Sequence, residues 1–255
     1  MLPLLGPCAL SQSAEQKTSL KRLGIIAAMG AEARSLVGHP IAKGKTIYLP
    51  DGTMIQVSGI GPGKASSATK ALIEEGATDL LSWGSAGGLH LELSSGSLVL
   101  PKVIIRADRS IYSTDVQWHE RLCNRLRGYV DLHEGPLAES ATPLNNHMEK
   151  ESFYRRTGAI AVDMESGAVA AVAREADVSF MAIRAISDPF DAIIPASILY
   201  AIDEFGELDM LRFTKGLMRH PLELFSLIRL GQHFRAAQTT LKKVARLTGN
   251  NLLVP

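Results

Sequence analysis

The sequence predicts an α/β protein in which a mostly parallel or mixed β-sheet is sandwiched by helices. Short apolar runs at 23–29, 79–83, 159–162 and 178–186 have the length and the boundaries of buried strands, and helical patterns alternate with them. Two of these runs are followed by acidic residues, as happens where the last side chains of buried strands point into a cleft at the carboxyl edge of a sheet. At 255 residues the chain is long enough for one large α/β domain.

The composition is that of a globular protein and excludes disorder throughout, because 46% of the residues are hydrophobic and 21% are charged. Cys8 and Cys123 are too few and too far apart for a disulfide framework or a thiolate metal site. We expect no metal site, and we also expect no cofactor. The cysteine usage fits a reducing compartment, and we expect a cytoplasmic protein.

The N-terminal third begins with an extension and then builds the first strands. Residues 1–20 open on an apolar stretch that has two prolines and no preceding positive charge, so we expect a disordered extension rather than a signal peptide. A buried strand at 23–29 leads through Gly30 into a helix. Residues 45–49 and 53–58, joined by Pro-Asp-Gly, have the pattern of a hairpin.

The glycine-rich segment Gly59–Lys64 precedes a predicted helix at 64–75. A phosphate-binding P-loop requires four residues between its first glycine and the Gly-Lys pair, whereas here there are three, and Ala65 stands where Ser or Thr would bind magnesium. The segment also lacks the G-x-G-x-x-G spacing of dinucleotide-binding loops. It is therefore predicted to be a tight turn from strand to helix.

The middle of the chain combines a small-residue turn with surface polar groups. A strand at 79–83 is expected to end in the turn Gly84–Gly88, where backbone N–H groups and the Ser85 hydroxyl could converge on an anion or a hydroxyl. A strand at 97–106 and helices at 115–127 and 148–156 follow. The pairs His119-Glu120 and His133-Glu134 lack the second histidine of a zinc helix, so we expect surface residues there.

Two acids mark the candidate site. Glu165 follows the run 159–162 and precedes the small residues of a helix, whose positive end would lie near it. Asp188 follows the run 178–186, and Pro189 ends that strand. We therefore expect Glu165 and Asp188 to face one pocket, although buried acids at strand ends often serve only as helix caps or ion-pair partners.

The C-terminal part differs from the rest of the chain in charge. Between Arg212 and Arg246 there are eight Lys or Arg residues and one acid, Glu223, so this segment carries +7 and the rest carries −6 within a whole-chain charge of +1. We expect residues 21–205 to form the main domain and 206–255 to form basic amphipathic helices packed on it. The alternative is peripheral contact of these helices with the inner face of an anionic membrane. Nucleic acid is not expected as a partner, because the main domain is acidic.

Four motifs in order give the chain a family resemblance: Gly24–Glu32 (GIIAAMGAE), Gly84–Gly88 (GSAGG), Val162–Glu165 (VDME) and Arg184–Asp188 (RAISD). Together they resemble the purine nucleoside phosphorylase and nucleosidase superfamily, and most closely its methylthioadenosine/S-adenosylhomocysteine nucleosidase branch. The resemblance implies a three-layer α/β/α fold with a central mixed sheet and a C-terminal helical extension. It also implies a homo-oligomer.

The resemblance assigns roles to the matching residues. Asp188 would protonate the purine N7 and, with Ser187, bind the base, while Met164 and Glu165 would bind the ribose. Glu32 matches the nucleosidase residue that activates water. Three residues match phosphate ligands of the bacterial phosphorylases, namely Gly30, Arg34 and Ser85.

Two reactions therefore stay open, and both cleave the N-ribosyl bond of an adenine nucleoside. The segment Leu211–Leu230 resembles the C-terminal extension of hopanoid-associated phosphorylases, and Pro143-Leu144 replaces the aromatic residue that stacks on adenine in nucleosidases. These two features favour phosphorolysis of adenosylhopane in hopanoid biosynthesis, with phosphate as co-substrate. The alternative is a hydrolytic methylthioadenosine/S-adenosylhomocysteine nucleosidase, and the third reading is a non-catalytic adenosine-binding module.

Overall fold

The computed structural model describes residues 21–42, 44–195, 198, 201, 203–206, 209, 224–249 and 252–254. The expected extension at 1–20 and most of the segment that resembles hopanoid-associated phosphorylases lie outside these residues. The described strands are β1 (Leu23–Ala27), β2 (Thr46–Tyr48), β3 (Met54–Val57), β4 (Asp79–Gly88), β5 (Leu98–Val99), β6 (Val103–Ile105), β7 (Ile111–Ser113), β8 (Leu132–His133), β9 (Leu137–Glu139), β10 (Ala161–Asp163) and β11 (Ser179–Asp188). The described helices are α1 (Gly30–Val37), α2 (Pro62–Glu74), α3 (Val116–Leu126), α4 (His147–Thr157), α5 (Ser166–Glu175) and α8 (Leu224–Thr248).

The strands form one mixed sheet with two branches at β4. One path runs β2-β3-β1-β4-β10-β9-β6-β7, and on the other side of the branch β11 joins β4 to β5, which pairs with β8. Strands β3, β1, β4 and β11 are mutually parallel, while β10 runs antiparallel to β4. The parallel centre brings the carboxyl ends of β1, β4 and β11 to the same edge, which is where a cleft is expected.

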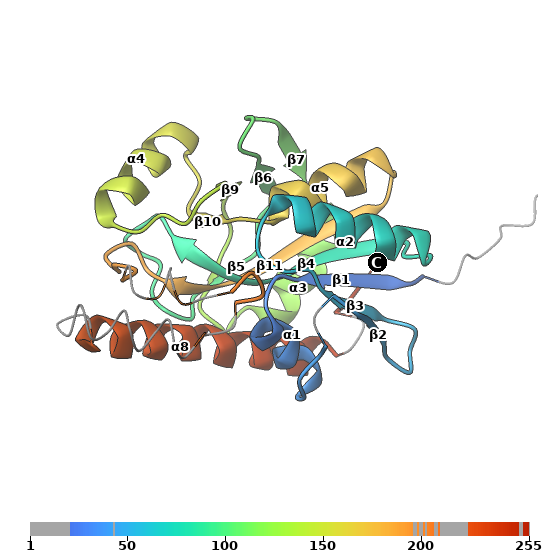
Figure 1. The fold of residues 1–255 in the computed structure, drawn as a ribbon. Helices are drawn as coiled ribbons and strands as arrows, with labels where there is room; N and C mark the ends of the chain where they lie inside the picture. The colour runs from blue at the N-terminus through green and yellow to red at the C-terminus, as the bar shows by residue number, and fades with distance from the viewer. Residues whose placement is uncertain are drawn as a thin grey trace, which may run out of the picture.

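Helices cover both faces of the sheet and produce three layers (Figure 1). Helices α2 and α5 pack side by side on one face, above an apolar cluster that includes Leu72, Leu80 and Ile186. Their small residues, among them Ala65, Ala68 and the alanines of α5, let both helices approach the sheet closely. The predicted fold, a three-layer α/β arrangement around a mixed sheet with a C-terminal helix, is confirmed.

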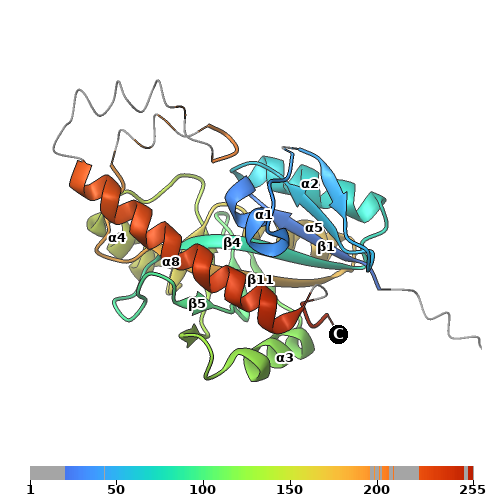
Figure 2. The same cartoon turned by 90° about the horizontal axis from the view of Figure 1, so that it is seen from below.

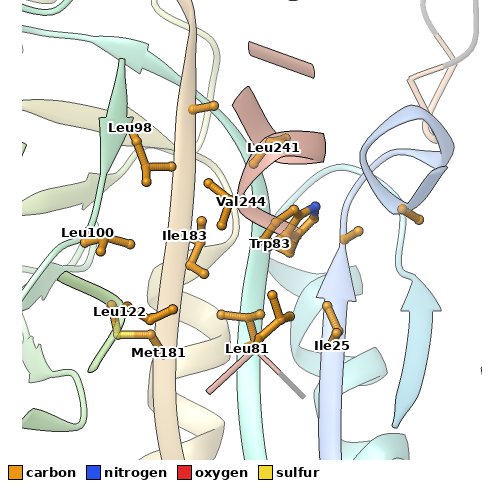
Figure 3. Close-up of a cluster of buried hydrophobic side chains, with 14 of the residues drawn as sticks. Ile25, Leu81, Trp83, Leu98, Leu100, Leu122, Met181, Ile183, Leu241 and Val244 are labelled. Atoms are coloured by element: carbon orange, nitrogen blue, oxygen red, sulfur yellow. The ribbon is translucent and has the colours of Figure 1, made fainter. Parts of the chain in front are cut away.

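Helix α8 crosses the opposite face beneath β4 and β11 (Figure 2). Its apolar positions Ala237, Leu241 and Val244 are fully buried and recur at the three- and four-residue spacing of a helix that packs by one face. Leu241 and Val244 lie in one cluster with Trp83 and Ile183 of the sheet (Figure 3). Because burial of such a side chain contributes about 1.5–3 kcal/mol, α8 is an energetically substantial part of this layer.

One sequence prediction about the sheet was wrong. Residues Gly84–Gly88 were expected to form a turn, but they continue β4. Their backbone pairs with β11 on one side, from Gly84 opposite Arg184 to Gly87 opposite Asp188, and Gly87 and Gly88 pair with β10 on the other. Pairing with β11 along Gly84–Gly87 and with β10 at Gly87 and Gly88 stabilises an extended backbone in a sequence whose composition alone favours a turn. The hairpin, the strand end at Asp188 and the helix after residue 115 lie where the sequence placed them.

Among the described residues, no helix is both long enough and apolar enough to cross a membrane.

Candidate active site

A cavity of about 160 Å³ opens at the carboxyl ends of β1, β4 and β11. Six of the residues proposed from the sequence line it together: Glu32, Ser85, Met164, Glu165, Ser187 and Asp188. The remaining walls are mostly small or apolar and include Ala28, Met29, Ile60, Ala86, Gly87, Val162 and Ile194. Together with Asp163, four acidic residues therefore line one small concave space, and Glu165 and Asp188 are both among them, as the sequence predicted.

A β-bulge brings two consecutive residues of β11 into the cavity. Ile186 pairs with Ala86 and Asp188 pairs with Gly87, so the ladder skips Ser187. In a regular strand, neighbouring side chains point to opposite faces, whereas a bulge re-aims them. Ser187 and Asp188 both line the cavity as a result, and the Ser187 hydroxyl donates to Asp188 Oδ1 at 3.0 Å.

Glu165 stands at the N-cap position of α5, where β10 gives way to the helix. Its side chain is buried, and its Oε1 accepts a hydrogen bond of 2.8 Å from the Gly61 N–H in the glycine-rich segment. Burial, reinforced by the nearby Asp163 charge, raises the pKa of Glu165. The glycine-rich segment thus contributes a backbone donor to this site, which agrees with its predicted role as a turn.

Glu32 projects from the first turn of α1 toward β4. Its Oε1 accepts hydrogen bonds of 2.8 Å from both the N–H and the hydroxyl of Ser85, and its Oε2 accepts one of 3.0 Å from the Met29 N–H. Burial raises the pKa of Glu32, and this effect outweighs the Arg184 charge and the three hydrogen bonds, which lower it. A Cβ on Gly84 would lie 2.7–2.9 Å from this carboxyl group, so the close approach requires glycine at that position.

A buried cation lies beneath the acids. Arg184 donates to Asp163 Oδ2 at 2.7 Å and to the hydroxyls of Ser82 and Ser166. Asp163 in turn accepts from the Ser166 N–H at the start of α5. Because Arg184 lowers the pKa of both Glu32 and Glu165, this network partly offsets the cost of burying two acids in one place.

Two proposed phosphate ligands lie elsewhere. Gly30 is the first residue of α1 and does not line the cavity. Arg34 is exposed and borders a separate hollow with Lys242 and Arg246 of α8, because its position on α1 turns it away from the sheet edge that carries Glu32. The chain thus brings Ser85 to the acids but not Arg34.

The wall expected to contact the base is formed by Ser140, Thr142, Pro143 and Leu144. No Phe, Tyr, Trp or His is among the residues that line the cavity in the described part of the chain. The departure noted in the sequence, Pro143-Leu144 in place of an aromatic residue, therefore lies at the cavity itself.

One residue of the two His-Glu pairs corrects another expectation, while Glu120 and Glu134 are exposed as expected. His119 is buried rather than on the surface, its Nε2 lies 3.1 Å from the Leu100 carbonyl oxygen, and it groups with Cys123 and Glu134 closely enough for one ion. However, Glu134 already pairs with Lys102 and Arg127, and burial raises the pKa of the Cys123 thiol to about 11. A divalent cation would meet two positive side chains and a protonated thiol, so this donor set does not suit a metal.

Lys150 is a site residue that the sequence analysis missed. It is completely buried, and its ammonium group contacts Asp188. Helix α4 has the polar composition of a surface helix, and nothing in its sequence distinguishes Lys150 from its charged neighbours.

Comparison with known proteins gives concordant results. A family model described as the phosphorylase superfamily matches residues 22–210. The 5'-methylthioadenosine/S-adenosylhomocysteine nucleosidase of Buchnera aphidicola subsp. Acyrthosiphon pisum (strain APS) is 26% identical over 186 residues, which cover 66% of this chain and 80% of the relative. The enzyme of the same name from Bacillus subtilis (strain 168) is 26% identical over 199 residues, which cover 66% and 85%.

Solved structures share the fold. The 5'-methylthioadenosine/S-adenosylhomocysteine nucleosidase of Neisseria meningitidis, in complex with methylthio-immucillin-A, superposes with a TM-score of 0.66 at 20% identity, covering 89% of this chain and 98% of that one. The futalosine hydrolase of Helicobacter pylori strain 26695 superposes with a TM-score of 0.63 at 19% identity, covering 88% and 96%.

Proposed function

Since the chain belongs to the phosphorylase superfamily, we propose that it cleaves the N-ribosyl bond of an adenine nucleoside by hydrolysis, with methylthioadenosine or S-adenosylhomocysteine as substrate. The observation that carries this proposal is that Glu32, Glu165 and Asp188 line one cavity. Acidic side chains around a small pocket suit a reaction in which the sugar becomes cationic while negative charge develops on the departing base, which a proton donor can neutralise.

Asp188 acts on the leaving group. It supplies a proton to the purine N7, so that the base leaves neutral when the C1′–N9 electron pair moves onto it. The adjacent Ser187 hydroxyl supports this role, because it donates to Asp188 Oδ1 and limits the orientations of the carboxyl group.

Glu165 and Met164 hold the sugar. The Glu165 carboxyl group accepts hydrogen bonds from the ribose hydroxyls, and in its ionised form it stabilises C1′ as that carbon becomes cationic. Met164 gives apolar contact to the sugar. Both side chains border the cavity at the start of α5, and the Gly61 N–H fixes one Glu165 oxygen.

Glu32 activates the attacking water. A general base works best when its pKa lies near the working pH, and burial raises the pKa of Glu32 from its ordinary value of 4.5 in that direction. The Ser85 and Met29 donors hold both carboxyl oxygens in place. The exposed position of Arg34, outside the cavity, favours water over phosphate as the nucleophile.

A specific observation keeps phosphorolysis of adenosylhopane as a second candidate. Ile193, Phe225 and Ile228 are large apolar side chains that are 63%, 79% and 52% exposed, and Ile193 adjoins Ile194 at the cavity wall. Ile193 also borders the same small hollow as the first turns of α8. An apolar surface beside the cavity suits a lipid-linked nucleoside and peripheral contact with a membrane.

One assay separates the candidates. Adenine release is measured from methylthioadenosine, S-adenosylhomocysteine and adenosylhopane, each with and without phosphate. We expect release from the first two that does not depend on phosphate. Release only from adenosylhopane and only with phosphate would establish the second candidate, and no release from any nucleoside would favour a non-catalytic adenosine-binding module.

The proposed partners need separate measurements. If the second candidate holds, the protein binds anionic vesicles and a Phe225→Glu variant does not, since a charge replaces an apolar side chain of α8 that is largely exposed. Sedimentation of the purified chain tests the homo-oligomer that the resemblance implies.

A further inference from the structure

The side chain of Lys150 in α4 is completely buried, and its ammonium group contacts two consecutive residues, Asp188 and Pro189. Its Nζ donates to the carbonyl oxygens of Asp188 at 2.9 Å and Pro189 at 2.7 Å, and it lies 3.1 Å from Asp188 Oδ2. An ammonium group has three N–H donors. Two of them are donated to the carbonyl oxygens at the end of β11 and just after it, and the ammonium group also forms an ion pair with the Asp188 carboxyl group.

Burial of a charged amine is costly unless an opposite charge and hydrogen bonds compensate for it. A methionine would occupy nearly the same volume without this cost. A lysine whose only role was to donate to two carbonyl oxygens could do so from the protein surface and would not need to be buried. The feature that distinguishes lysine at this place is its positive charge, and the acidic group it faces is the Asp188 carboxyl group, whose side chain is 15% exposed toward the cavity.

The Asp188 carboxyl group is held from several directions. Lys150 contacts Oδ2, the Ser187 hydroxyl donates to Oδ1, and a Cβ on Gly87 would lie only 2.8 Å from Oδ2. Helix α4 is tied to the same chain segment a second time, because the His147 ring meets the Phe190 ring at 4.4 Å in an edge-to-face arrangement. The amino-terminal half of α4 thus fixes the segment that carries the proposed acid.

We propose that Lys150 is a positioning residue for Asp188 in N-ribosyl cleavage. This inference rests on the proposed function. When the Asp188 proton passes to the purine N7, the carboxyl group becomes a carboxylate, and the C1′–N9 electron pair stays with the departing base. The fixed ammonium group of Lys150 keeps its own protons and stabilises the negative charge that develops on Asp188, without any reorganisation of solvent.

Three substitutions at this position separate charge from packing. Lys150→Gln keeps a polar donor but removes the charge, Lys150→Met keeps only the bulk, and Lys150→Arg keeps the charge. We expect the Gln and Met variants to lose kcat by at least ~10-fold with KM little changed, because the interaction gains strength only as charge develops on Asp188. The Arg variant should recover most of the loss. Arg155→Gln, which removes an exposed positive charge from the same helix, is the matched control and should leave kcat unchanged.

The decisive comparison places each change in an Asp188→Asn background. If Lys150 acts through Asp188, Lys150→Gln lowers kcat no further once Asp188 is gone. The inference is overturned if the Gln variant is as active as the wild type, or if its loss is the same with and without Asp188. A wild-type chain that releases no adenine overturns the proposed function itself, which is a different outcome. If the Met variant does not fold, the Gln and Arg variants decide the question.

Discussion

The contact between Gly84 and Glu32 gives the sharpest test of the nucleophile assignment. Gly84→Ala adds one methyl group to β4 at a residue whose φ is not in the left-handed region, so the backbone accepts alanine. The new Cβ would lie 2.7 Å from Glu32 Oε1, 2.8 Å from Cδ and 2.9 Å from Oε2. The substitution therefore acts on the position of this carboxyl group and leaves its chemistry unchanged.

The size of the effect follows from these distances. Packed atoms prefer separations of about 3.5 Å, so the carboxyl group must retreat by about 0.7–0.8 Å. Its bonds to the Ser85 N–H and hydroxyl, now 2.8 Å, would stretch to the limit of a hydrogen bond. Loss of one hydrogen bond to a charged group costs about 1.5–3 kcal/mol. In the transition state that corresponds to a decrease in kcat of about 10- to 100-fold.

The assay is steady-state adenine release by folded Gly84→Ala protein, with the unfolding temperature measured in parallel. Gly63→Ala is the matched control, because a Cβ there has no atom within 4 Å and should leave kcat unchanged. A Gly84→Ala variant that folds and turns over at the wild-type rate would refute the assignment of Glu32 as the group that activates water.

Four further predictions follow from the same geometry. Asp188→Asn lowers kcat by ~10²-fold or more in adenine release, because the proton source is removed; an equal rate would exclude Asp188 as the acid. Arg34→Ala leaves activity and its phosphate dependence unchanged, as measured by initial rates across a phosphate series, since this side chain is outside the cavity. Activity declines as pH falls through the raised pKa of Glu32, since the base must be ionised. Stability against urea has the opposite trend. The stabilising contribution of Glu32 and Glu165 is fully present below the ordinary carboxyl pKa of 4.5 and is lost as pH rises through their raised pKa values. If a Glu32→Gln variant shows the same pH dependence of stability as the wild type, the contribution assigned to Glu32 is wrong. Leu241→Ala lowers the free energy of unfolding by about 2–5 kcal/mol, as measured by denaturant titration, because the side chain is fully buried between α8 and the sheet.

The sequence predicted the fold through features that act locally. Apolar runs bounded by glycine, proline or charge gave β1 and β11, and Pro189 correctly marked the end of β11. The turn predicted for Gly84–Gly88 failed because small residues are compatible with both turns and strands. Long-range pairing with β10 and β11 decided between them.

The candidate site was predictable to the extent that its residues lie directly after strands. Glu165 and Asp188 were expected in one pocket for that reason, and both line the cavity. Arg34 was included because its spacing from Gly30 matches a family motif. Its actual direction depends on how α1 is rotated against the sheet, and the motif does not specify that rotation. Charge spacing alone likewise could not identify Lys150, whose burial results from the approach of α4 to the end of β11.

The domain division remains a proposal. We propose that residues 21–205 and 206–255 belong to a single domain, because the described part of the C-terminal segment supplies side chains to the same buried cluster as Trp83. The unfolding transition of the whole chain, followed by two optical probes, tests this proposal, since separate domains would give two transitions.

The bulge at Ser187 adds one residue to β11 without adding a paired position to the sheet. Hydrogen-bond pairing resumes at Asp188 opposite Gly87, directly after Ile186 opposite Ala86, so Ser187 occupies no rung of the ladder. A residue outside the ladder can change its side chain while the strands on either side keep their partners. The cavity wall can therefore diversify at this one point, in natural lineages or in a designed library, without a shift of strand register, and the contact that such a change replaces is the hydrogen bond from Ser187 to Asp188.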